Sequence, residues 1–270
     1  MFAAGTDGFV TASTPDRPRT DALPAPPPGH NQTMPHSLLL CELHAHTDWS
    51  DGHLSLAELV DLYGGAGFDV LCVTDHTARL DDPASNFVDG WTWPGYIAAI
   101  EHEAERALAE YDLLLVPGVE LTDDHSDPAN AAHVLAVGLR KYVSMEHGIV
   151  RAILGARAEG AAIIAAHPYS SADWTAHSPT CRLWRERESF AQIVDRWELA
   201  NGKEILGWVA EERRPLVATG GFHRREDLSS WKTLIPCRKS ERAIIAHLRS
   251  LAPVYVMPVS EGAPEERYAA

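Results

Sequence analysis

From Ser37 onward, short apolar runs alternate with longer segments in which apolar residues recur every three or four positions. The short runs are typical of buried strands, and the periodic segments are typical of amphipathic helices. The predicted strands are 38–43, 70–74, 113–119, 133–139, 161–166, 193–199, 216–219 and 254–257. The predicted helices are 56–63, 96–111, 148–159, 203–212 and 240–250, and a long loop is predicted over 168–184. Repeated strand–helix units predict a parallel α/β sheet, and seven or eight of them predict a closed or nearly closed barrel.

The first 36 residues differ in character from the rest of the chain. They are rich in proline and show no apolar period, so we expect residues 1–36 to form a disordered tail and 37–270 to form one domain. A single β/α barrel needs about 250 residues, which is close to the length that remains.

The acidic net charge of the chain argues against some classes of binding partner. The formal net charge is −15, from 38 acidic and 23 basic residues, and such a surface repels nucleic acid and anionic membranes. No apolar run is long enough to span a membrane, and no signal peptide is visible. The chain has four cysteines, which we expect to be free thiols in a reducing cytoplasm: Cys41, Cys72, Cys181 and Cys237.

Residues that commonly bind metals stand at the ends of the predicted strands. His44 and His46 end the first strand, and side chains two positions apart in a strand point to the same face. The ends of later strands supply His76, Glu120, His167 and His223. His133 begins the fourth strand and reaches the same rim only if that strand enters from it. Because barrel enzymes place their chemistry at one rim, this agreement predicts a metal site there.

Other polar residues are expected to be structural. Asp75 is expected to cap a turn, and His53 lies off the pattern. The remaining histidines are expected on the surface: His102, His125, His147, His177 and His247.

The run from His44 to Gly52 resembles the first motif, H-x-H-[ST]-x-x-S-D-G, of the PHP (polymerase and histidinol phosphatase) family. Shorter matches follow in the family's order. They are Thr74-Asp75-His76, Gly118-Val119-Glu120, Ala166-His167-Pro168 and the segment around His223, with Glu198-Leu199-Ala200-Asn201 resembling a Glu-x-x-Asn strand end. The resemblance covers about residues 38–257 and implies a distorted (β/α)7 barrel of PHP type.

The resemblance also implies two or three divalent ions, commonly Zn, Mn or Fe. It assigns His44, His46 and Glu120 to a first ion. It assigns the shared Glu120, with His133 and His167, to a second, and Asp51, His76 and His223 to a third.

One position departs from the family pattern. The last motif of the family is D-x-H, in which the aspartate also binds the first ion, but Gly221 stands at that place here. We therefore expect a weakened first site. We also expect Gly221→Asp, which adds only a short side chain at a rim position, to restore the ligand.

The activity that the resemblance implies is hydrolysis of a small phosphate ester, of the nucleotide or sugar phosphate class, by a metal-bound hydroxide. Arg224 is a candidate to hold the substrate phosphate. Two alternatives stay open: a catalytically impaired PHP domain, which Gly221 favours, and a metal hydrolase of the amidohydrolase type. Loops 77–95 and 168–190 would set the substrate, and their tryptophans are expected to pack: Trp91, Trp93, Trp174 and Trp184.

Overall fold

The structure is a computed structural model, and it describes residues 38–81, 86–125, 127–170 and 180–260. The chain divides into two units, Met1–Met34 and Pro35–Ala270, and all described residues belong to the second. The tail predicted over 1–36 lies outside the described residues, as do Trp174 and His177.

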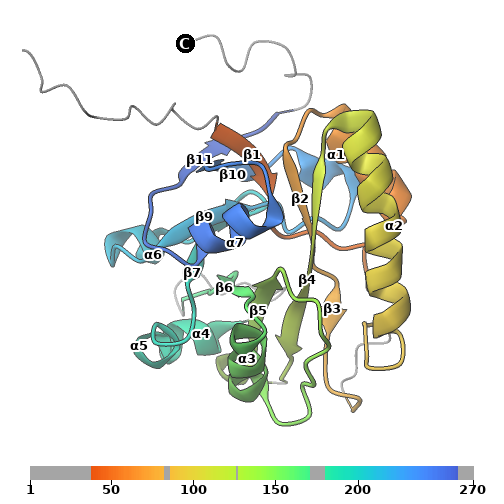
Figure 1. Cartoon of the computed structure of the whole chain (residues 1–270). Coiled ribbons are helices and arrows are strands. Elements are labelled where there is room, and N and C mark those ends of the chain that lie inside the picture. Colours follow the sequence, from red (N-terminus) through yellow and green to blue (C-terminus); the bar gives the residue numbers. More distant parts are fainter. Residues whose placement is uncertain (1–37, 82–85, 126, 171–179, 261–270) are drawn as a thin grey trace, which may run out of the picture. The chain divides into compact units, whose positions relative to one another are not determined.

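A mixed sheet of eleven strands runs through the second unit (Figure 1). Its hydrogen-bonded order is β11-β10-β1-β2-β4-β5-β6-β7-β8, while β3 pairs with β4 and β9 pairs with β7. The strands are β1 (Leu38–Glu42), β2 (Val70–Val73), β3 (His76–Thr77), β4 (Leu114–Asp123), β5 (Ala132–Val137), β6 (Ala162–Ala166), β7 (Arg196–Asn201), β8 (Glu204–Ile205), β9 (Leu216–Thr219), β10 (Trp231–Pro236) and β11 (Tyr255–Pro258).

The expectation of a wholly parallel sheet is wrong. β5 is antiparallel to both β4 and β6, and β10, which the hydrophobic pattern missed, is antiparallel to β1. A parallel connection needs a crossover of about a dozen residues or more, and the link between β4 and β5 is too short for one. The parallel pairs are β1–β2, β2–β4, β3–β4, β6–β7 and β7–β9.

The segments that follow β1 and β9 meet just beyond the carboxyl end of β1. Ala45 and Phe222 form a parallel bridge, in which His46 N donates to Phe222 O at 2.9 Å and Phe222 N donates to His44 O at 3.0 Å. The segment that follows β9 is therefore bound to the segment that follows β1. This arrangement is consistent with a barrel-like α/β fold whose functional rim lies at the carboxyl end of β1.

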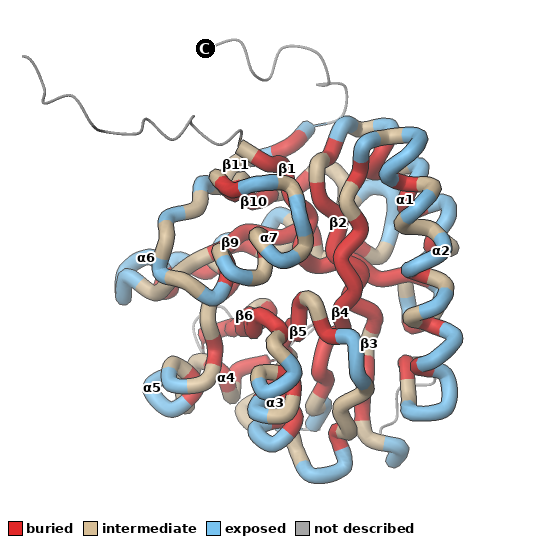
Figure 2. Tube along the Cα trace, in the orientation of Figure 1, coloured by how far each residue is buried: buried red, intermediate tan, exposed pale blue. Residues whose placement is uncertain are grey.

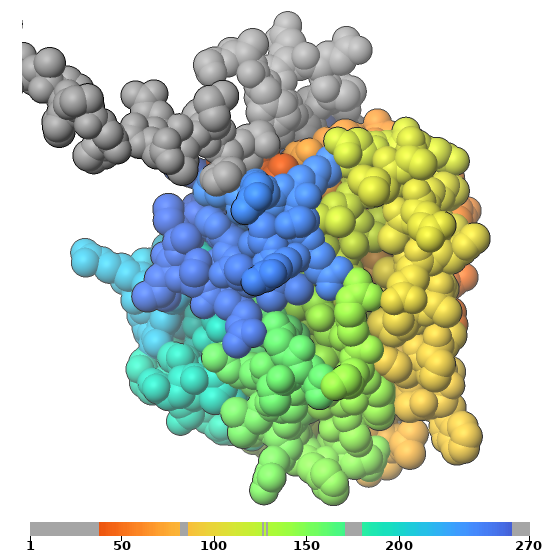
Figure 3. All heavy atoms as spheres, in the orientation of Figure 1, coloured from red at the N-terminus to blue at the C-terminus, as the bar shows by residue number. Residues whose placement is uncertain are grey.

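Helices cover the outside of the sheet. They are α1 (Leu56–Gly65), α2 (Trp93–Tyr111), α3 (Ile149–Ala158), α4 (Cys181–Arg185), α5 (Arg187–Phe190), α6 (Gly207–Glu211) and α7 (Glu241–Leu248). Figure 2 shows the central strands buried along most of their length, while the helices are exposed on their outer faces. On the face seen in Figure 3, side chains of α2, α3 and α7 form much of the surface. No helix among the described residues is both long and apolar enough to cross a bilayer.

The predicted positions of α1, α2, α3 and α7 are confirmed. The predictions for residues 203–212 and 168–184 are wrong. The predicted helix 203–212 shrinks to α6, because Gly202 (φ +59°) turns the chain back and the next residues form β8 against β7. The predicted loop 168–184 ends early, because α4 begins at Cys181.

Candidate metal centre

Strand geometry brings the eight candidate ligands to one rim. His76 and Glu120 are partners across β3 and β4, while His44, His167 and His223 directly follow or lie just beyond β1, β6 and β9. The reversal of β5 resolves the case of His133. Because β5 runs antiparallel to its neighbours, its first residues lie at this rim, and His133 pairs with Thr122 and Ala166 there.

Glu120 lies at the centre of five imidazoles. Its side chain is 1% exposed. Its Oε1 lies 3.2 Å from His133 Nδ1 and 3.1 Å from His167 Nε2. Its Oε2 faces three other nitrogens: His44 Nε2 at 3.2 Å, His46 Nε2 at 3.3 Å and His76 Nδ1 at 3.2 Å. The two oxygens of one carboxylate thus face two different sets of imidazoles, as a ligand shared between two cations would.

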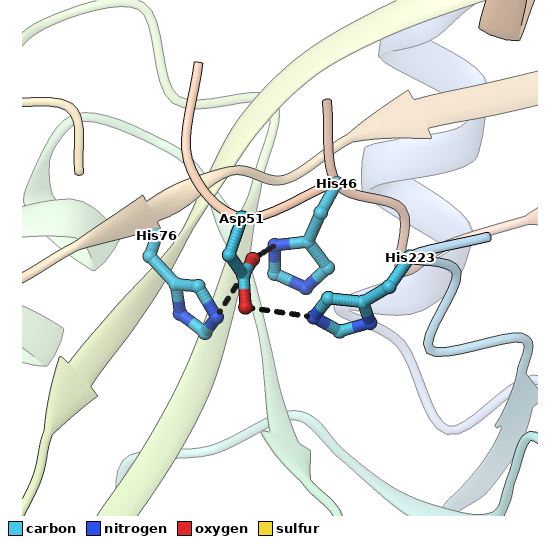
Figure 4. A group of neighbouring side chains, drawn as sticks. All are labelled: His46, Asp51, His76 and His223. Atoms are coloured by element: carbon cyan, nitrogen blue, oxygen red, sulfur yellow. Dashed lines mark ion pairs between the residues drawn. The ribbon is translucent and has the colours of Figure 1, made fainter. Parts of the chain in front are cut away.

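A second group of imidazoles surrounds Asp51, on the more exposed side of the rim. Its oxygens lie 3.7 Å from His46 Nδ1, 3.5 Å from His76 Nε2 and 3.3 Å from His223 Nε2. Figure 4 shows the three rings arranged around this carboxylate. The Asp51 side chain is 54% exposed and that of His223 is 35% exposed, whereas the ligands around Glu120 are mostly buried.

The donor atoms fit divalent ions. Among the residues that the structure describes, three groups have ligand atoms within 4.8 Å of one another: His46, Asp51, His76 and His223; His44, Glu120 and His167; and His76, Glu120 and His133. Imidazole nitrogen with carboxylate oxygen is a donor set that suits Zn and Fe, and carboxylates also suit Mn. The second and third groups share Glu120, which is the residue that the resemblance places between the first two ions.

The electrostatics favour the ionised carboxylates that a cation needs. Burial alone would raise the pKa of Glu120, but the charges of His44, His76 and His133 lower it well below its ordinary value. Burial likewise opposes a charge on His133, yet Glu120 and Asp124 raise the pKa of its imidazole to about 10. Both shifts favour positive charge beside the Glu120 carboxylate.

Two carboxylates that hold the candidate ligands have no role in the sequence-based assignment. Glu198 is fully buried, with Oε1 2.9 Å from His44 Nδ1. Asp124 Oδ1 lies 2.8 Å from His133 Nε2. A carboxylate that accepts from one ring nitrogen leaves the other nitrogen free as a metal ligand. The Glu-x-x-Asn match pointed to Glu198 without a role, while Asp124 directly follows β4 and carries no sequence signal.

Asp75 holds the loop that carries Asp51. It is fully buried, and it accepts hydrogen bonds from Thr47 N at 2.7 Å, Thr47 Oγ1 at 2.8 Å and Ser50 Oγ at 2.6 Å. Burial raises the pKa of Asp75 to about 6. Asp75 therefore supports the turn within the first motif, as a capping residue does.

The structure leaves little space for an aspartate at position 221. Gly221 has φ +52°, in the left-handed region that favours glycine. A Cβ built there would lie 2.8 Å from Asn201 Nδ2 and 2.9 Å from Asn201 Cγ, and closer still to Oδ1. The side chain of Asn201 occupies the space that an aspartate would need.

The histidines expected on the surface and the tryptophans expected to pack differ in outcome. Among the described histidines, His102, His125 and His147 are exposed and join none of the three groups. Trp93 packs against Tyr96 and Tyr142 as expected, but Trp91 is 91% exposed, so the packing expected of it is wrong.

We expect Glu198→Gln to weaken zinc binding about tenfold, because the neutral amide no longer raises the basicity of the His44 ring. The measurement is a competition titration of the purified protein against a fluorescent zinc chelator. Glu211→Gln, at an exposed position of α6, is the matched control and should bind as the parent does. Equal zinc affinity in the two variants would show that Glu198 has no part in holding His44.

Comparisons with known proteins support the fold. No family model matches the chain, and no curated protein matches it in sequence. The structure resembles a two-domain protein from Bacteroides vulgatus that contains a predicted PHP-like metal-dependent phosphoesterase, with 19% identity and a TM-score of 0.57. The match covers 79% of this chain and 63% of that one, so this chain spans less than two thirds of its length. At this identity the likeness shows a shared fold alone.

Two further similarities are weaker. A protein from Bifidobacterium adolescentis, whose description as a metal-dependent phosphoesterase is itself a prediction, is 16% identical over 69% of this chain and 88% of its own, with a TM-score of 0.43. An amidohydrolase from Chromobacterium violaceum is 15% identical over 68% of this chain and 87% of its own, with a TM-score of 0.47. Scores below 0.5 do not establish a common fold, so the relationship rests on the Bacteroides protein.

Proposed function

We propose that the chain is a metal-dependent phosphoesterase with a distorted (β/α)7 barrel of PHP type, acting on a small phosphate ester of the nucleotide or sugar phosphate class. The observation that carries this proposal is the buried Glu120 carboxylate, whose two oxygens face separate sets of imidazoles. Such a shared carboxylate suits a pair of ions that act together on one phosphate.

The chain's own residues would hold two or three ions of Zn, Mn or Fe. His44 and His46 would bind one ion together with Glu120. His133 and His167 would bind a second ion with the same carboxylate. His76, Asp51 and His223 would bind a third, on the exposed side. Divalent ions in such sites lower the pKa of water toward neutrality and neutralise phosphate oxygens.

Exposure indicates where the substrate approaches. Asp51 and His223 are the open members of the centre, so a phosphate would enter over them. Arg224 directly follows His223, is exposed, and lies with its Nε 3.3 Å from His53 Nε2. Its guanidinium would bind a phosphate oxygen beside the third ion.

The decisive experiment measures metal content and phosphate release together. The purified protein is loaded with Mn or Zn, analysed for bound metal, and tested on nucleotides, sugar phosphates and a chromogenic phosphate ester, with and without a chelator. We expect at least two ions per chain and a phosphatase activity that the chelator abolishes. Bound metal without release of phosphate from any substrate would reject the proposed activity, and less than one bound ion would reject the site.

Arg224→Ala should raise KM for the best phosphate ester roughly tenfold, through loss of a charged hydrogen bond, and should leave metal content unchanged. Arg225→Ala removes an equally exposed arginine one residue away and is the control. Steady-state kinetics of both variants make the comparison. A KM for Arg224→Ala equal to that of the control would remove Arg224 from the substrate site.

The second candidate function is a PHP-type domain that binds metal or ligand with impaired catalysis. Gly221 favours it, because the carboxylate that the family places there is missing and Asn201 fills the space. This candidate predicts normal metal content with no turnover in the experiment above.

A further inference from the structure

Two opposite charges are wholly buried beneath the centre. Glu42 ends β1, Lys232 lies in β10, and both are fully buried with Glu42 Oε2 2.7 Å from Lys232 Nζ. Neither side chain belongs to the three groups of candidate ligands. Burying two charges costs so much desolvation that stability alone is a weak explanation for such a pair.

The carboxylate of Glu42 binds two separate stretches of backbone. Its Oε1 accepts from Leu43 N at 3.0 Å and His44 N at 3.1 Å, where the chain leaves β1. The same oxygen accepts from Gly220 N at 2.8 Å, in the turn that follows β9. One side chain therefore fixes the backbone of His44 and the start of the segment that leads to His223.

The ammonium of Lys232 holds the other end of that segment. Its Nζ donates to Ser230 Oγ at 2.6 Å and to the carbonyl of Asp227 at 3.4 Å. Asp227 in turn accepts from His223 N at 3.0 Å and Arg224 N at 2.8 Å through its carboxylate. The loop that carries His223 is thus tied to the buried pair at both of its ends.

Gly220 is part of the same arrangement. A Cβ at this position would lie 2.5 Å from Lys232 Nζ and closer still to Glu42 Oε2. The backbone approaches the buried pair so closely that only glycine leaves room for both charges.

We propose that Glu42 and Lys232 are positioning residues that hold His44 and His223 at a fixed separation, and so couple the ion position at Glu120 to the one at Asp51. The inference rests on the proposed function, because it concerns the geometry of a metal centre. An apolar pair of equal volume would fill the same space, but it would leave the N–H groups of His44 and Gly220 without an acceptor.

The test is the double variant Glu42→Gln with Lys232→Met, which removes both charges together and keeps the side-chain volume and one carbonyl acceptor. Cobalt(II) replaces the native ion, and the readouts are the affinity for each successive ion, the visible absorption spectrum and the unfolding temperature. We expect a folded protein in which the last ion to bind is about tenfold weaker and the spectrum is altered.

Arg196→Met is the matched control. Arg196 is a buried cation at the start of β7, and it donates to the carbonyls of His247, Leu248, Ser250 and Ala252. Its loss should lower the unfolding temperature and leave the cobalt affinities and spectrum as in the parent. A loss of cobalt affinity as large as that of the double variant would overturn the inference, since any buried charge would then have the same effect.

The outcomes separate the two proposals. A folded double variant with parental cobalt affinities and spectrum overturns the positioning role alone. A parent protein that binds no cobalt rejects the metal centre and this inference with it.

If the double variant does not fold, the Ser230→Ala variant provides the test, because it removes only the hydroxyl between Lys232 and the loop. Weaker binding of the last cobalt ion supports the inference, and unchanged binding overturns it.

Discussion

Glu120→Gln should reduce the bound metal from at least two ions to less than one per chain and lower any phosphatase activity on the order of a hundredfold or more. The amide has the shape of the carboxylate but no charge, and only one of its two polar atoms can accept a metal or a proton. Because each oxygen of Glu120 faces its own set of imidazoles, the change damages two ion positions at once. Elemental analysis after incubation with Mn or Zn, followed by activity assays, measures both effects.

Glu105→Gln is the control for this variant, since Glu105 is exposed on α2 and distant in sequence from every candidate ligand. Its metal content and unfolding temperature should match those of the parent. A Glu120→Gln protein that retains two ions would show that the histidines bind metal without a shared carboxylate, and the proposed bridging role would then be wrong.

The gathering of the histidines at one rim could be predicted from the sequence, because it follows from the geometry of single strands and of their ends. Residues two apart at a strand end share a face, which brings His44 and His46 together, and strand ends of one barrel meet at one rim. His133 shows the limit of that reasoning. Its position depended on the direction of β5, and direction follows from a connection too short for a crossover rather than from any hydrophobic period.

The supporting residues could not be predicted because they act through contacts between distant segments. Glu198 reaches His44 across 154 positions of sequence, and the Gly220 backbone reaches Glu42 across 178. β10 was missed for a similar reason. The apolar run in β10 is short, and Lys232 interrupts it. A lysine in the interior is explained by its buried partner Glu42, which lies far away in the sequence.

Gly221→Asp should lose stability and gain no metal. A non-glycine residue in the left-handed region costs on the order of 1–3 kcal/mol, which for a domain of this size lowers the unfolding temperature by roughly 3–10 °C. The new side chain must also displace Asn201, whose Nδ2 lies 3.0 Å from Glu198 Oε2 and 3.3 Å from His44 Nδ1. Moving Asn201 therefore disturbs the carboxylate that orients His44, so we expect weaker metal binding.

Three further variants separate the causes of that loss. Gly221→Asn carries a similar backbone cost and adds a side chain of the same shape without charge, so it isolates the effect of the carboxylate. Asn201→Ala provides the background in which the space beside position 221 is open, and Gly221→Asp is then added to it. Thermal unfolding and zinc titration of the set give the comparison. If aspartate binds zinc more tightly than asparagine only in the Asn201→Ala background, the side chain of Asn201 sterically excludes a metal ligand from position 221. If it does so in the parent background as well, the loop has room for the ligand, and the steric conflict between position 221 and Asn201 does not govern the site.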